Sequence, residues 1–218
     1  MNPIRSLLAS LVLASLAVLA PAGVALGAGI DPSGKYDAIK PPQPTETPGK
    51  VEVLEVFSYA CPHCFTFLPT MENYEKTKPD YVEVRHMPAI FRESWVPLAR
   101  AYYTAELLGV VDRVHRPIFE AIHVHKEPLD DRDTLMKFFE KYGVSNDDFN
   151  KTYDSFAVES LLRKSQVMQG RYRVMGTPSV IVNGKYRVSG NLAGSPEEMM
   201  LVVGALAERE NAERVASQ

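Results

Sequence analysis

The chain has 218 residues, a formal net charge of −3 and a pI near 6.0. This balance gives no electrostatic footprint for nucleic acid or for an anionic membrane surface. About 190 residues follow an apolar N-terminal segment, enough to bury a normal core in one domain or in a domain with an insertion.

The first residues have the pattern of a bacterial export signal. Arg5 precedes an uncharged apolar run from Leu7 to Ala20, and small residues suited to cleavage occupy positions 25–28. We therefore predict a signal peptide over residues 1–27. An uncleaved anchor is the alternative, because the apolar stretch continues to Leu26 and approaches the roughly 20 residues that span a bilayer. Either arrangement places the rest of the chain on the oxidising side of a membrane, where a disulfide persists.

The next segment, residues 28–50, is rich in proline. It contains Pro41-Pro42-Gln43-Pro44 and ends near Pro48-Gly49. Prolines and a Pro-Gly pair at this density are typical of irregular chain. We interpret this segment as an N-terminal arm rather than packed structure.

A strand followed by a dithiol helix comes next. Residues 51–57 alternate and are rich in β-branched residues, which predicts a buried strand. The only two cysteines follow in the motif Cys61-Pro62-His63-Cys64. Pro62 suits the first helical position, which leaves Cys61 at the cap with its sulfur facing unpaired amides and the positive end of the helix dipole. There a cysteine pKa falls from about 8.5 to between about 3.5 and 7.5. His63 is placed to donate a hydrogen bond or positive charge to the same sulfur.

Two other uses of the cysteines remain open. A zinc half-site is one, but structural zinc usually needs four ligands and no second CxxC exists. We interpret His115, His123 and His125 as surface residues in helical sequence rather than as the missing ligands. A purely structural disulfide is the other, although closing so short a loop stabilises little.

The remaining elements predict an α/β fold class with a helical insertion. The dithiol helix is expected over residues 62–78 with a kink at Pro69, and residues 81–86 alternate as a second strand, parallel to the first. A helical block then fills residues 95–173, too long for a simple crossover. Its helices are predicted at 96–108, 110–123, 133–142 and 155–173.

The chain ends in a hairpin and a helix. Strands at residues 179–182 and 185–188 flank Asn183-Gly184, a strong hairpin signal. A last helix starts at Ser195, with Glu198 completing a capping box. It is expected to bury Met199, Val202, Val203 and Leu206.

Five segments of the chain together carry a family resemblance. They are residues 53–64 with the Pro-His dipeptide, Leu108-Gly109-Val110, Phe119-Glu120, Ser155-Phe156 and residues 176–186. These segments resemble the DsbA family of periplasmic thiol:disulfide oxidoreductases. The resemblance covers nearly the whole mature chain and implies a thioredoxin fold, divided into residues 51–93 and 166–210 by a helical insertion at 94–165. It also implies donation of disulfides to exported proteins with free thiols, and reoxidation by a DsbB-like, quinone-linked membrane oxidase, with no cofactor or metal.

The resemblance also implies roles for individual residues. Cys61 is expected to be the nucleophile and Cys64 the resolving cysteine, with Thr177 and Pro178 forming a cis-proline loop that binds substrate beside the sulfurs. Glu55 is expected to be a buried carboxylate that relays protons beneath the thiols, with Arg85 on the neighbouring strand as its partner. Ala60 and Thr177 depart from the familiar family pattern and leave the redox potential open.

Two other functions stay in view. A disulfide isomerase or reductase shares the chemistry, but an isomerase usually needs a dimerisation domain, and the arm is too short for one. We expect a monomer in the periplasm. A metal-binding module is the remaining alternative, and thiol titration with and without a chelator separates it from the redox functions. The sequence does not identify the clients.

Overall fold

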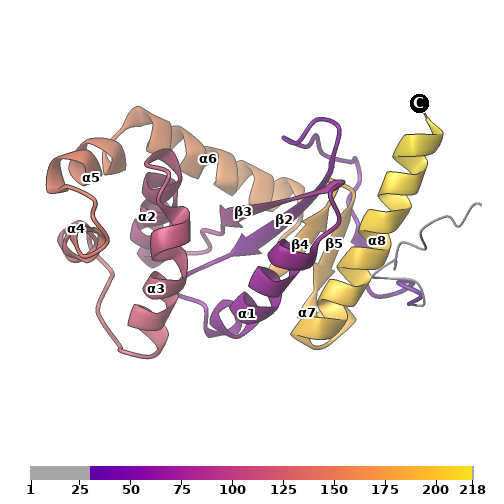
Figure 1. The fold of residues 1–218 in the computed structure, drawn as a ribbon, viewed down its shortest axis with the longest axis horizontal. Coiled ribbons are helices and arrows are strands. Elements are labelled where there is room, and N and C mark those ends of the chain that lie inside the picture. The colour runs from indigo at the N-terminus through magenta and orange to yellow at the C-terminus, as the bar shows by residue number, and fades with distance from the viewer. Residues whose placement is uncertain (1–29, 218) are drawn as a thin grey trace, which may run out of the picture.

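A computed structural model describes residues 30–217, so the predicted signal peptide at 1–27 lies outside the described residues. The described chain forms a five-stranded mixed sheet in the order β1-β5-β4-β2-β3 with helices around it (Figure 1). This agrees with the predicted α/β class. The strands are β1 (Asp37–Ala38), β2 (Val51–Phe57), β3 (Val82–Pro88), β4 (Ser179–Val182) and β5 (Tyr186–Ser189). The helices are α1 (Pro62–Thr77), the 3-10 turn η1 (Glu93–Trp95), α2 (Val96–Leu107), α3 (Val111–His123), α4 (Arg132–Glu140), α5 (Asn146–Tyr153), α6 (Phe156–Arg171), α7 (Gly190–Ala193) and α8 (Pro196–Ala216).

Strand β2 lies between β4 and β3 in the sheet, and all of its residues are buried. It pairs in parallel with β3, from Val51 opposite Val82 to Phe57 opposite Pro88. On its other side it pairs antiparallel with β4, with Val53 opposite Val182. The sheet is therefore completed by strands that come before and after the helical insertion.

The two faces of the sheet have separate cores. Val51 and Val53 point toward α1 and α8, which pack against each other on one face (Figure 1). Leu54 and Val56 point to the opposite face and join a cluster with Ile181. The capping box at the start of α8 is present as predicted, and the four residues expected to be buried there are buried.

The helices α2 to α5 gather at one end of the molecule around a core of their own (Figure 1). Phe57, Tyr59 and both cysteines belong to the same cluster, so the dithiol lies at the junction of the sheet with these helices. The predicted insertion, 94–165, spans α2 to α5 and the first part of α6. Helix α5 was missed by the sequence analysis, because it is short and polar and is marked mainly by its Ser145 cap.

The prediction that the N-terminal arm is not packed structure was wrong. Residues 37–38 of the arm form β1, which pairs antiparallel with β5 at the edge of the sheet. Ile39 is only 3% exposed. The arm is thus packed structure from this point, because it completes the hydrogen bonding of an edge strand and covers apolar surface. None of the helices in residues 30–217 has the length and apolar character needed to cross a membrane.

Candidate active site: the dithiol at the start of α1

The first cysteine occupies the N-cap of α1. Cys61 has extended backbone angles, φ −94° and ψ 116°, and Pro62 is the first helical residue. The side chain of Cys61 makes no capping hydrogen bond to the first turn, but the nearby backbone amides of His63 and Cys64 help to lower the pKa of its thiol. The helix start itself is the one that the sequence predicts, with Cys61 at the cap and Pro62 after it.

The two sulfurs differ in their affinity for a proton. The hydrogen bond from the Cys64 thiol outweighs burial and, together with the Thr177 side chain and the two backbone amides, lowers the pKa of Cys61 to about 5. Burial raises the pKa of Cys64 far above its ordinary value, and the neighbouring Cys61 and Glu55 add to this rise. At neutral pH Cys61 is therefore a thiolate beside a protonated Cys64, which makes Cys61 the better nucleophile and leaving group.

A loop from the other end of the chain lies against the first sulfur. The peptide bond between Thr177 and Pro178 is cis, as predicted. The Cys61 sulfur is 3.4 Å from the Thr177 carbonyl oxygen. Thr177, Pro178 and His63 also line a cavity of about 570 Å³ beside the dithiol. Met175, 86% exposed, stands at its rim, so an apolar side chain is open to solvent next to the reactive sulfur.

His63 lines the cavity beside the dithiol. Its backbone N–H contributes to the lowered pKa of Cys61. An effect of the His63 imidazole on the thiolate stays a prediction.

Glu55 is buried beneath the thiols, but its predicted partner was wrong. Glu55 lies opposite His86 in the β2–β3 pair, and its Oε2 is 2.8 Å from His86 Nδ1. The other ring nitrogen of His86, Nε2, is 2.6 Å from Oε1 of Glu75 on α1. Although burial opposes the charge, the two carboxylates raise the pKa of His86 to about 10. Arg85 points away from this cluster because successive side chains of a strand face opposite sides of the sheet.

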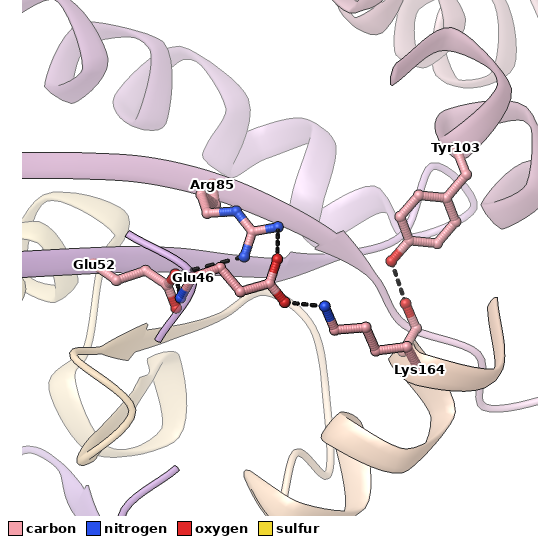
Figure 2. A network of polar contacts seen from close by, with 6 residues as sticks. Glu46, Glu52, Arg85, Tyr103 and Lys164 are labelled. Carbon is pink, nitrogen blue, oxygen red and sulfur yellow. Dashed lines mark hydrogen bonds and ion pairs between the residues drawn. The ribbon is translucent and has the colours of Figure 1, made fainter. Parts of the chain in front are cut away.

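Arg85 instead forms a polar network on the far face of the sheet (Figure 2). Its guanidinium lies 2.8 Å from a Glu46 oxygen and 3.5 Å from a Glu52 oxygen. Lys164 of α6 also pairs with Glu46. In the same view, the Tyr103 hydroxyl of α2 bonds to Ser165 of α6. This network ties the arm, the sheet and α6 together, away from the sulfurs.

The prediction that His115, His123 and His125 lie at the surface was wrong for the first two, which belong to α3. His115 Nδ1 is 2.9 Å from the Tyr59 hydroxyl, and His123 Nε2 is 2.8 Å from the Tyr59 carbonyl oxygen. Burial, with the charges of His86 and Arg116, lowers the pKa of His115 well below its ordinary value. Only His125 is exposed. The single-chain pattern could not show that α3 packs on the residues before the dithiol.

Within residues 30–217, no group of three or more His, Cys, Asp or Glu side chains is arranged to hold a metal ion. An α/β fold with a thiolate at a helix N-cap, a second, buried thiol beside it and a cis-proline loop defines a thiol:disulfide oxidoreductase of the thioredoxin fold.

The comparisons with known proteins agree. The model of the DSBA-like thioredoxin domain matches residues 52–195, and the chain belongs to this family. It is 37% identical over 187 residues to the thiol:disulfide interchange protein DsbA of Pseudomonas syringae pv. tomato, covering 85% of this chain and 87% of the relative. The DsbA of Pseudomonas aeruginosa is 36% identical over 200 residues, covering 91% and 95%.

Solved structures give the same result. The crystal structure of Pseudomonas aeruginosa DsbA matches with a TM-score of 0.79 and 36% identity, over 83% of this chain and 94% of that one. The oxidoreductase DsbA from Xylella fastidiosa matches with a TM-score of 0.77 and 35% identity, over 82% and 96%. The chain is therefore a disulfide oxidoreductase with a thioredoxin fold.

Proposed function

We propose that the protein donates its Cys61–Cys64 disulfide to exported proteins that carry free thiols. The observation that supports this most is the unequal proton affinity of the two sulfurs, with the pKa of Cys61 near 5 and that of Cys64 far above its ordinary value. A stabilised thiolate favours the reduced enzyme, and an enzyme whose reduced form is favoured is an oxidant.

The exchange proceeds in two steps. A client thiolate attacks the Cys61 sulfur, the Cys61–Cys64 bond breaks, and Cys64 takes the electron pair and a proton. A second client thiolate then attacks the client sulfur of the mixed disulfide, and Cys61 leaves as a thiolate. The client loses two electrons and two protons in forming its disulfide, and the enzyme gains the two electrons.

Glu55 is proposed to carry the proton that Cys64 needs. It lies beneath the thiols, and its charge contributes to the raised pKa of Cys64. His86 connects it to Glu75, whose side chain is 36% exposed, so the buried acid has a hydrogen-bonded route toward solvent. A group that exchanges protons within hydrogen-bond reach serves as a general acid or base.

Substrate binding is assigned to Thr177 and Pro178. Their backbone borders the cavity beside Cys61, where an extended client segment can pair with an exposed edge. His63 is proposed to tune the oxidising power from the wall of the same cavity. Pro62 fixes the helix start that presents both sulfurs.

The remaining cellular context is also proposed. We assign the protein to the periplasm as a monomer, delivered by a signal peptide at residues 1–27 and reoxidised by a DsbB-like, quinone-linked membrane oxidase. The resemblance to DsbA proteins supports these assignments. The chemistry of exchange needs electrons only from thiols, so no cofactor is assigned.

Single-cysteine variants test the proposal. Cys64→Ser should trap a mixed disulfide with a reduced two-cysteine peptide, and Cys61→Ser should neither donate nor trap. If the Cys61 variant forms the adduct and the Cys64 variant does not, the roles are reversed. Equilibration with glutathione buffers then separates an oxidant from a reductase, and a scrambled-disulfide substrate reports isomerase activity.

A further inference from the structure

One face of α3 carries three residues that all contact Tyr59. They are His115, Phe119 and His123, which we call the α3 stripe; their spacing of four residues places them one above the other on a helix. The two histidines hydrogen-bond to the hydroxyl and to the carbonyl of Tyr59. The ring of Phe119 packs edge-on to the Tyr59 ring, with centroids 4.9 Å apart. Tyr59 itself is 1% exposed, so the stripe encloses it.

The stripe also contacts the chain just after the dithiol. The His123 ring stacks on Phe65 with centroids 5.1 Å apart and planes within 13°. Phe65 follows Cys64 directly, and Tyr59 precedes Cys61 by two residues. Phe119 stacks on the same Phe65 ring with centroids 6.2 Å apart. A helix of the insertion thus holds the dithiol turn on both sides, and of the two residues that contact both sides, His123 is the one that also hydrogen-bonds to the main chain.

The donor in the hydrogen bond between His123 and the main chain can be assigned. A carbonyl oxygen only accepts, so Nε2 of His123 carries the hydrogen and donates it to Tyr59 over 2.8 Å. In the same turn, the Cys61 N–H donates to the Ser58 carbonyl over 3.0 Å. Together these bonds orient the peptide groups that lead into the N-cap. An apolar side chain would fill the same space without fixing that orientation.

We infer that His123 is a positioning residue for the dithiol: its hydrogen bond to Tyr59 keeps the Cys61 sulfur aligned with the amides at the start of α1. Hydrogen bonds to a thiolate are charge-assisted and roughly twice as strong as those between neutral groups. Loss of alignment therefore destabilises the reduced enzyme more than the disulfide form. This inference rests on the proposed role of Cys61 as the nucleophile.

The test uses two substitutions of similar shape and different chemistry. His123→Gln keeps a side-chain N–H that reaches the Tyr59 carbonyl, whereas His123→Met has a similar length and no donor. For each variant, the ultraviolet absorbance of the thiolate gives the Cys61 pKa, and equilibration with glutathione gives the equilibrium constant for reduction. His125→Met, two residues further and exposed, is the matched control.

We expect His123→Met to raise the Cys61 pKa and to lower the equilibrium constant for reduction about fivefold, which corresponds to about 1 kcal/mol, the net value of one hydrogen bond. His123→Gln should restore both values to within about twofold, on the same hydrogen-bond scale. The His125 control should match the unmodified protein.

Two outcomes overturn the inference. One is that His123→Met destabilises the oxidised and reduced forms equally in thermal unfolding and leaves the thiolate titration unchanged, which assigns His123 to packing alone. The other is that His123→Gln behaves like His123→Met.

If His123→Met does not fold, His123→Asn replaces it as an amide too short to reach the carbonyl. Failure of the unmodified protein to oxidise a client would count against the proposed function and leave the titrations interpretable.

Discussion

Strands β2 and β3 carry two buried acid–base pairs, one on each face of the sheet. Glu55 pairs with His86 beneath the thiols, and Glu52 pairs with Arg85 in the network of Figure 2. Both glutamates are almost fully buried, at 3% and 1% exposed. The bases differ: the guanidinium of Arg85 keeps its proton even in alkali, whereas the imidazole of His86, with a pKa of about 10, can exchange one. The pair built with arginine is therefore a fixed structural tie, and the pair built with histidine is suited to proton transfer.

The largest expected effect is on stability at alkaline pH. The folded-state pKa of His86 is raised from 6.5 to about 10, so its stabilising contribution is complete below about pH 6.5 and is lost as pH rises through 10. Between these values stability should fall by up to about 1.4 kcal/mol for each pH unit. Urea unfolding of the protein and of His86→Gln, from pH 6 to 10.5, measures it. The difference between the two should shrink as pH rises; a constant difference would contradict the assignment.

Glu55→Gln should affect the chemical step. Without an acid at this position, the reaction of the oxidised enzyme with a client thiol should slow about 10-fold to 100-fold at neutral pH, in the lower range of general acid–base effects. Stopped-flow measurement of the exchange across pH gives the rate. Glu52→Gln, the same change on the opposite face, should leave the rate within about twofold because it has no route to the thiols.

Glu52→Gln should instead weaken the fold. Arg85 would lose one of its two carboxylate partners and keep Glu46, so the free energy of unfolding should fall by about 1–2 kcal/mol. Chemical denaturation measures the loss. A slowed exchange reaction with unchanged stability would reverse the roles that we give to the two faces.

Lys164→Met should have the smallest effect. Lys164 is half exposed and pairs with Glu46 at the margin of the network, and exposed ion pairs contribute about 0–1 kcal/mol. Unfolding in low and high salt checks this, since the contribution should shrink with added salt. Oxidase activity should match that of the unmodified protein.

The turns and caps of the site could be predicted from the sequence. The contacts between segments far apart in the chain could not. Pro62 after Cys61 specifies the cap within a few residues, and the Asn183-Gly184 turn with Pro178 before it specifies the hairpin and its loop. The partner of Glu55 depends on strand register, where a shift of one residue exchanges Arg85 for His86 and reverses the face.

Two other predictions, for the α3 histidines and for the N-terminal arm, were wrong for the same reason. His115 and His123 lie on a helix whose packing partner is more than 50 residues earlier in the chain, and no periodicity marks that contact. The arm forms β1 with only two residues, too few for an alternating pattern. In each case the decisive interaction joins distant segments.

The pairing of β2 with β4 determines the order in which the molecule can be assembled. Val53 and Val182 are partners across the centre of the sheet, and the whole helical insertion lies between them in the chain. Contacts between such distant segments form late, because a long loop must close first. As the polypeptide emerges N-terminus first, the helices α2 to α5 can pack before the sheet is complete, while the dithiol segment waits for its last strands and for α8. The reactive turn therefore acquires its final surroundings only when nearly the full length of the chain is available, and a nascent chain carries two cysteines without the oxidising site that they later form.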